Sequence, residues 1–261
     1  MTIEVFNRYE KKYILEEEIF EKLQSKLSEH MKLDDYNEKQ ESYTISNLYY
    51  DTQDNYMIRS SLQKPKYKEK LRLRAYGVPE SSTKVFVEIK KKVDGLVNKR
   101  RSALELDEAY AFLETGELPD YKSYQNRQVL NEISYILHRH ELSPALYLAY
   151  DRTAYFGIDQ HDLRVSFDNN IRTRRYDLSL EDGVYGSQLL DGRYRLMEIK
   201  TSQSIPIWLC RLLSEYEIYP SSFSKYGAEY QKMMKSTGMT YPVYEFAPQK
   251  AAKTRFSVVN A

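Results

Sequence analysis

Polar and apolar residues alternate along much of this chain, and a period of two is typical of half-buried strands. The pattern predicts strands over 3–14, 43–50, 66–76, 84–93, 96–106, 145–156, 163–168 and 194–201, with weaker forms at 171–180 and 184–189. Apolar residues at helical spacing predict helices over 16–30, 107–115, 121–140, 205–215 and 224–236, and a short one at 54–63. Strands therefore dominate, with helices between and after them.

Several neighbouring strands are joined by short turns, such as Asp94-Gly95, which indicates antiparallel pairing. Closing such a sheet on itself would remove its exposed edges. We therefore predict an α+β fold, an eight-stranded antiparallel closed β-barrel with flanking helices. No repeat or low-complexity linker divides the chain, so 1–236 is predicted to be a single domain and 237–261 a C-terminal tail.

Charged residues recur on one face of the predicted strands, because side chains at i, i+2 and i+4 share a face. On 66–74, that face carries Lys66, Lys68, Lys70, Arg72 and Arg74. Other strands place on one face Arg8, Glu10 and Lys12; Lys84, Glu88, Lys90 and Lys92; Tyr150 and Arg152; Arg164, Ser166 and Asp168; and Glu198 with Lys200.

Two interpretations of these faces are open. For any one strand, a solvated polar face is the commoner explanation. However, a row of cations repels itself, and arginine suits bidentate contact with phosphate. If the faces point into a closed barrel, they line a basic tunnel that fits a phosphate chain.

Acidic residues stand among these cations. Glu10, Glu88 and Glu198 each lie two residues before a lysine. Each alone is most simply a structural ion pair. Together they could hold Mg²⁺ or Mn²⁺, which prefer oxygen ligands and share them with phosphates.

The remaining composition excludes several classes of protein. The net charge of +1 argues against general attraction of nucleic acid. A single cysteine and four histidines exclude an internal disulfide and a Cys/His metal cluster. No signal peptide and no apolar segment of about 20 residues is present, so we expect a cytoplasmic protein without a transmembrane segment.

Short motifs in a fixed order resemble a known family. They are R-Y-E-K-K-Y, K-L-R-L-R, F-V-E-I-K, Y-D-R-T-A-Y, L-R-V-S-F-D, M-E-I-K and F-S-K-Y-G. Over roughly residues 3–235 the chain resembles the VTC domain, the polyphosphate polymerase domain of the vacuolar transporter chaperone complex. That domain belongs to the triphosphate tunnel metalloenzymes, which are related to the CYTH proteins.

The resemblance implies an eight-stranded tunnel barrel that makes inorganic polyphosphate from ATP with a divalent metal, releasing ADP. It implies catalytic roles for Arg72, Arg74, Lys90, Arg152 and Glu198. It implies phosphate binding by Lys12, Lys70, Arg8, Lys99, Arg101, Arg164, Lys200 and Lys225, with Lys225 near the tunnel mouth. The implied metal ligands are Glu198, Glu10 and Glu88.

One departure from the wider superfamily is visible. Its N-terminal E-x-E-x-K is here R-x-E-x-K, with Arg8 in the first position, which removes one carboxylate and favours the VTC branch. The expected partners are ATP or another triphosphate and inorganic polyphosphate, not nucleic acid. A polyphosphate polymerase, a tripolyphosphate or nucleoside triphosphate hydrolase and a non-catalytic polyphosphate-binding module remain open, as does the oligomeric state.

Overall fold

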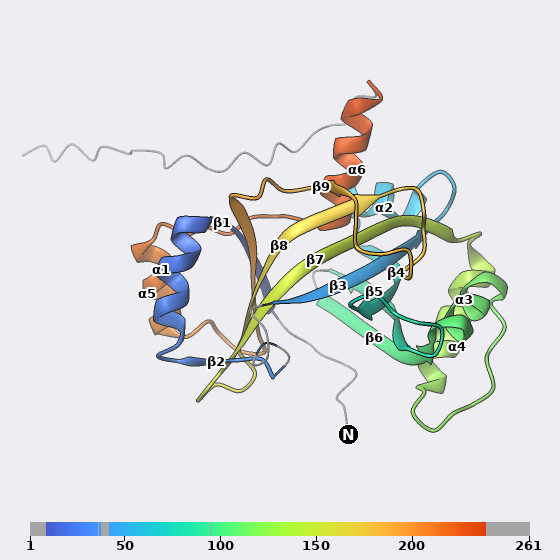
Figure 1. Ribbon diagram of the computed structural model, residues 1–261, viewed down its shortest axis with the longest axis horizontal. Helices are drawn as coiled ribbons and strands as arrows, with labels where there is room; N and C mark the ends of the chain where they lie inside the picture. The colour runs from blue at the N-terminus through green and yellow to red at the C-terminus, as the bar shows by residue number, and fades with distance from the viewer. Residues whose placement is uncertain (1–8, 36, 38–41, 95, 239–261) are drawn as a thin grey trace, which may run out of the picture.

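The structure, a computed structural model, describes residues 9–35, 37, 42–94 and 96–238 (Figure 1). Its strands are β1 (Tyr9–Glu16), β2 (Met31–Leu33), β3 (Tyr43–Asp51), β4 (Tyr67–Tyr76), β5 (Lys84–Val93), β6 (Leu96–Glu105), β7 (Ser143–Gly157), β8 (Arg164–Arg174), β9 (Ser187–Gln188) and β10 (Tyr194–Thr201). Its helices are α1 (Glu17–Leu27), α2 (Tyr56–Leu62), α3 (Leu106–Thr115), α4 (Arg127–Arg139), α5 (Ile207–Glu215) and α6 (Lys225–Ser236).

All the strands belong to one antiparallel sheet, in the order β1-β10-β8-β7-β3-β4-β5-β6. The short strands β2 and β9 pair with β7 and β8 outside this path. The hairpin between β5 and β6 turns at Asp94, whose φ of 45° lies in the left-handed region that such turns need. The α+β class and the antiparallel pairing are confirmed.

The prediction of a closed barrel is wrong. Strands β1 and β6 end the order, and no ladder joins them within the described residues. The sheet is nevertheless strongly curved, because Lys90 Nζ on β5 lies 3.6 Å from Glu10 Oε2 on β1. This contact is made by the ends of two long side chains. The backbones of β1 and β5 are therefore farther apart than the roughly 4.8 Å that separates paired strands. The sheet therefore has a concave face and stays open at its edges.

Two apolar cores lie on the convex face. One packs strands β4 and β5 against α3 and α4 and includes Leu71, Val87, Phe112 and Ile133. The other lies under α1 and α5, at the opposite end of the sheet from α3 and α4 (Figure 1). It includes Tyr13, Leu23, Phe167, Met197 and Leu209. The apolar members of each charged strand point into these cores, so the charged members point to the concave face.

Helix α6 covers one end of the concave face. Its Tyr226 and Tyr230 pack with Phe223 against apolar residues of β3, β7 and β10, including Tyr49 and Leu196. Ser224 caps the helix, because its side chain accepts a hydrogen bond from the backbone N–H of Gly227. The start of α6, including Lys225, is thereby held at the concave face.

Some predicted elements differ in extent. The helix predicted over 121–140 starts at Arg127, because the Asn126 side chain accepts a hydrogen bond from Val129 N–H and caps it there. The segment predicted as a strand over 184–189 contributes only the two-residue strand Ser187–Gln188, and residues 171–174 continue β8.

None of the helices in the described ranges is both long and apolar enough to cross a membrane. The single-domain and cytoplasmic assignments stay predictions.

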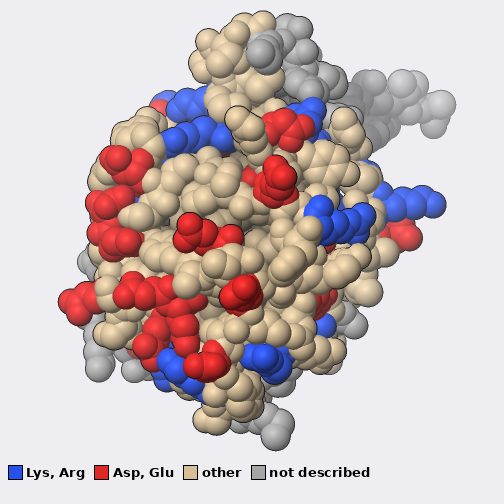
Figure 2. All heavy atoms as spheres, turned by 90° about the vertical axis from the view of Figure 1, so that its right-hand side faces the viewer, with Lys and Arg blue, Asp and Glu red and all other residues tan. Residues whose placement is uncertain are grey.

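Acidic residues gather on the convex side. The face that carries α3 and α4 shows more acidic than basic side chains (Figure 2). Exposed acids of α3 and the segment after it include Asp107, Glu114, Glu117 and Asp120. Although the net charge is only +1, the charges are unevenly distributed, with acids enriched on this outer surface and cations enriched on the concave face.

Candidate functional site

The concave face brings together nearly all of the predicted site residues. Those that lie on it are Glu10, Lys12, Lys70, Arg72, Arg74, Glu88, Lys90, Lys99, Arg101, Arg152, Arg164, Glu198, Lys200 and Lys225. Arg8 lies outside the described residues. Cations outnumber acids on this face, so it favours an anionic ligand.

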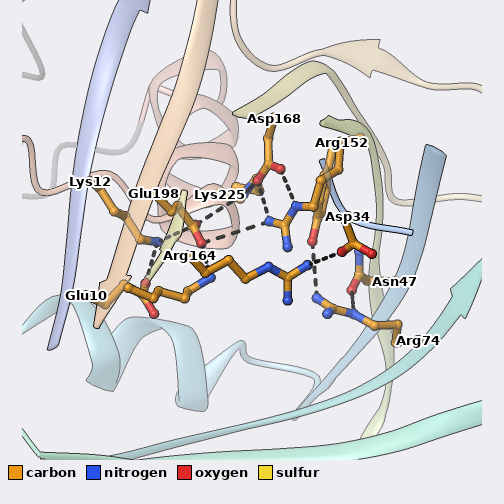
Figure 3. A network of polar contacts seen from close by, with 12 residues as sticks. Glu10, Lys12, Asp34, Asn47, Arg74, Arg152, Arg164, Asp168, Glu198 and Lys225 are labelled. Atoms are coloured by element: carbon orange, nitrogen blue, oxygen red, sulfur yellow. Dashed lines mark hydrogen bonds and ion pairs between the residues drawn. The ribbon is translucent and has the colours of Figure 1, made fainter. Parts of the chain in front are cut away.

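Glu198 lies at the centre of these contacts (Figure 3). Its carboxylate is 2.7 Å from Lys200 Nζ, 3.3 Å from Lys12 Nζ, 3.6 Å from Lys225 Nζ and 3.9 Å from Arg152 Nη2. Burial alone would raise the pKa of Glu198, but these cations hold it well below the usual range. Glu198 is therefore ionised and gathers cations from three strands and a helix.

Asp168 is a second anchor that the sequence analysis did not assign to the site. It accepts hydrogen bonds from Arg152 Nε at 2.6 Å and Nη2 at 2.8 Å, and it pairs with Lys225 Nζ. Its side chain is fully buried, and although burial would raise its pKa, Arg152 and Lys225 lower it. The alternation on β8, which places Asp168 beside Arg164, was the available signal.

Glu88 is surrounded by cations. Its oxygens lie 2.7 Å from Arg72 Nη2, 2.6 Å from Lys99 Nζ and 3.7 Å from Arg74 Nε. The side chain is 1 % exposed, and the net effect of its surroundings keeps the pKa of Glu88 well below the usual range, against the rise that burial alone would cause. These contacts suit an acid that orients arginines. The metal role implied for Glu88 stays a prediction.

Neutral polar groups fix the arginine side chains further. Arg74 donates from Nε to Asn47 Oδ1 at 3.0 Å and from Nη2 to the Tyr150 hydroxyl at 3.2 Å. Arg72 donates from Nη1 to the Tyr49 hydroxyl at 3.2 Å. The guanidinium groups are thus preorganised, which is the arrangement that binds phosphate most effectively.

Lys70 has no acidic partner within ion-pair distance in the described part of the chain. Its Nζ donates to Ser224 Oγ at 3.3 Å. Burial, together with the nearby Lys90 and Lys12, lowers the pKa of Lys70 to about 7. An anion bound here would relieve this repulsion and restore the charged form.

The donor set for a divalent cation is limited but suitable. Among the residues that the structure describes, no group of three or more His, Cys, Asp or Glu side chains is placed so that it could hold a metal ion by itself. The carboxylates of Glu10 and Glu198, however, lie close together, because both contact the same lysine. Lys12 Nζ lies 3.4 Å from Glu10 and 3.3 Å from Glu198. Mg²⁺ often binds one or two carboxylates and takes its other ligands from phosphates and water. These two carboxylates fit that pattern.

Glu10 is ionised as such a ligand must be. Burial and the neighbouring Glu198 would raise its pKa, but Lys200, Lys90 and Lys12 lower it to about 2. Its charge is therefore complete at neutral pH.

Comparison with solved structures gives similar folds of low sequence identity. A candidate adenylate cyclase of Bacillus halodurans is 14% identical, covers 98% of this chain and 100% of its own, and gives a TM-score of 0.46. A candidate adenylyl cyclase of Hippeastrum, described with a dominant triphosphatase activity, is 17% identical, with coverage of 91% and 98% and a TM-score of 0.48. A protein of Pyrococcus horikoshii is 13% identical, with coverage of 86% and 99% and a TM-score of 0.43. These similarities are too low to carry conclusions about this chain.

No curated protein matches the sequence. The profile of the VTC domain, in contrast, matches residues 7–234 and so covers most of the chain, including every residue of the concave site described above. This chain therefore belongs to the VTC domain family.

Proposed function

We propose that this protein is a metal-dependent phosphotransferase that synthesises inorganic polyphosphate from ATP. The observation that carries the proposal is the concave face, where arginines and lysines from separate strands surround Glu198 and exceed the acids in number. Polyphosphate and triphosphates are anions that match such a face. Membership of the VTC family supports the polymerase reaction that the sequence motifs imply.

In the proposed reaction, the terminal phosphate oxygen of the growing chain attacks the γ-phosphorus of ATP. The bond from that phosphorus to the β-phosphate oxygen breaks, and ADP leaves. Phosphoryl transfer needs positioning and charge neutralisation more than covalent help. Arg72, Arg74, Lys90 and Arg152 supply these, and Glu88 with Asp168 keeps the arginines in place.

A divalent ion, Mg²⁺ or Mn²⁺, would be held by Glu198 and Glu10 and would neutralise charge on the phosphate oxygens. Lys12 and Lys200 keep both carboxylates ionised, and Lys225 adds to this effect at Glu198. They would also bind the remaining oxygens of the phosphate chain.

The test is to incubate the protein with ATP and Mn²⁺ or Mg²⁺ and to look for ADP and long-chain polyphosphate on a gel. Arg72→Ala should lower kcat by about 10²–10³, by analogy with the removal of one oxyanion donor. Glu198→Gln should lower both turnover and Mn²⁺ binding. Arg193→Ala is the control, because Arg193 is exposed and pairs only with Asp191 among the described residues.

The products distinguish the alternatives. Orthophosphate without chain growth would identify a hydrolase that uses water as the acceptor. Metal-independent binding of polyphosphate without turnover would identify a binding module. Unchanged turnover in both Arg72→Ala and Glu198→Gln would refute the assignment of the site.

A further inference from the structure

A row of aromatic rings crosses the concave face beside the arginines. Tyr43 on β3, Tyr76 on β4 and Phe86 on β5 form this aromatic row, with ring centroids 6.0 Å apart for Tyr43 and Tyr76 and 6.0 Å for Tyr76 and Phe86. An arginine stands at each end. Arg164 donates to the Tyr43 hydroxyl at 3.4 Å, and the Arg101 guanidinium lies 4.5 Å from the Phe86 centroid.

The aromatic row lies next to the phosphate-binding arginines and away from α6. Phe86 pairs with Arg74 across β4 and β5, and Tyr76 follows Arg74 on the same face of β4. Contacts with α6 and its cap lie on the other side of Arg74, at Tyr49 and Lys70. Along a strand, same-face residues are about 7 Å apart, so Phe86 lies level with Arg74 and Tyr76 lies one such step beyond it.

Exposure separates this row from ordinary core packing. Tyr76 is 38 % exposed, whereas Tyr43 is only 7 % exposed. Phe86 is partly exposed, and Arg101 forms no ion pair within the described ranges. The exposed part of the row thus combines aromatic ring surface with a guanidinium that has no ion pair in the described ranges.

A phosphate chain has no apolar surface to place on aromatic rings. A nucleobase has a flat π-face that stacks on tyrosine and phenylalanine, and such stacking tolerates any base. We propose that the aromatic row, chiefly Tyr76 and Phe86, binds the nucleobase of a nucleoside triphosphate donor, whose phosphates extend past Arg74 towards Arg72. This inference rests on the proposed function, and it assigns the row to the donor nucleotide and not to the phosphate chain.

The inference predicts a difference between two ligands that share a triphosphate. We would measure Kd by calorimetry for ATP and for inorganic tripolyphosphate, with the intact chain. Tyr76→Ala should raise the Kd of ATP about 5- to 150-fold, the range of one lost base–aromatic stack. The Kd of tripolyphosphate should change by less than about twofold, because it makes no stack.

Two further variants control the result. Tyr76→Phe keeps the ring and should bind ATP as the wild type does. Tyr67→Ala removes a tyrosine that is 46 % exposed on the opposite face of β4, and it should leave both constants unchanged. If Tyr76→Ala does not fold, Phe86→Leu keeps a branched apolar side chain but removes the ring and should show the same preference.

Each outcome is decisive. Equal losses for ATP and tripolyphosphate, or no loss for either, would overturn the inference. A wild-type protein that binds tripolyphosphate but not ATP would also overturn it, while triphosphate binding at the concave face would stand. A wild-type protein that binds neither would refute the proposed function itself.

Discussion

Replacing the buried acid Asp168 by asparagine tests whether the concave site is held together by its own ion pairs. Asp168→Asn keeps the shape of the side chain and removes its charge. It leaves Arg152 and Lys225, both nearly buried, without their closest counter-ion. The side chain of Asp168 is fully buried, so water cannot replace the lost charge.

The expected loss is about 3 kcal/mol of unfolding free energy. Removing one partner of a buried ion pair costs about 3–5 kcal/mol. The low end applies because Glu198 lies 3.6 Å from Lys225 Nζ and 3.9 Å from Arg152 Nη2 and offsets part of the loss. Because the folded pKa of Asp168 is lowered, its contribution is complete above the unfolded pKa of about 3.9 and is lost as the pH falls through the folded value.

Urea unfolding at pH 7, followed by the fluorescence of Trp208, measures this loss. With an m-value of about 3 kcal/mol/M, the midpoint should fall by about 1 M. Asp191→Asn is the matched control, because Asp191 accepts the same two kinds of bond from Arg193 but is exposed, so its midpoint should hardly move. A loss below about 1 kcal/mol for Asp168→Asn would refute the reasoning, since it would mean that Glu198 suffices as the counter-ion.

Two predictions concern protonation. At pH 8, Lys70 with a pKa of about 7 is about nine-tenths uncharged, so tripolyphosphate binding should take up protons, measured by calorimetry in buffers of different ionisation enthalpy. Lys70→Met should reduce this uptake and Lys11→Met, on the outer face of β1, should not; equal uptake in both would contradict the assignment. Because its folded pKa is lowered to about 2, Glu10 stabilises the protein fully above pH 4.5 and loses this effect as the pH falls towards 2. The stability difference between wild type and Glu10→Gln should shrink over that window, and a difference independent of pH would refute it.

The residues on the concave face could be predicted from the sequence, because successive side chains of any strand point to opposite faces of the sheet. Arg72 and Arg74 share a face in any extended strand, and Leu71 and Leu73 must then face a core. The opposition of Glu88 and Arg101 across β5 and β6 follows from one hairpin register, which the short turn between Val93 and Leu96 sets.

Closure of the barrel was not predictable in this way. It depends on whether β1 meets β6, which are separated in the chain by residues 17–95, and no local pattern reports on that contact. The role of Asp168 was hidden for a similar reason, because its partners Arg152 and Lys225 come from a different strand and from α6. Only the family motifs suggested that Lys225 belongs to the site at all.

The location of the two apolar cores has a consequence for how this protein can change over evolutionary time. The cores that bury α1, α3, α4 and α5 lie behind the sheet, as Phe112 and Phe167 illustrate, whereas the proposed substrate site lies on the concave face. If the proposed site is correct, a substitution at Lys99 or Arg101 changes the ligand-facing surface without opening a void among the packed aliphatic side chains. Such a division lets one scaffold acquire new anionic substrates by exchanging front-facing side chains alone.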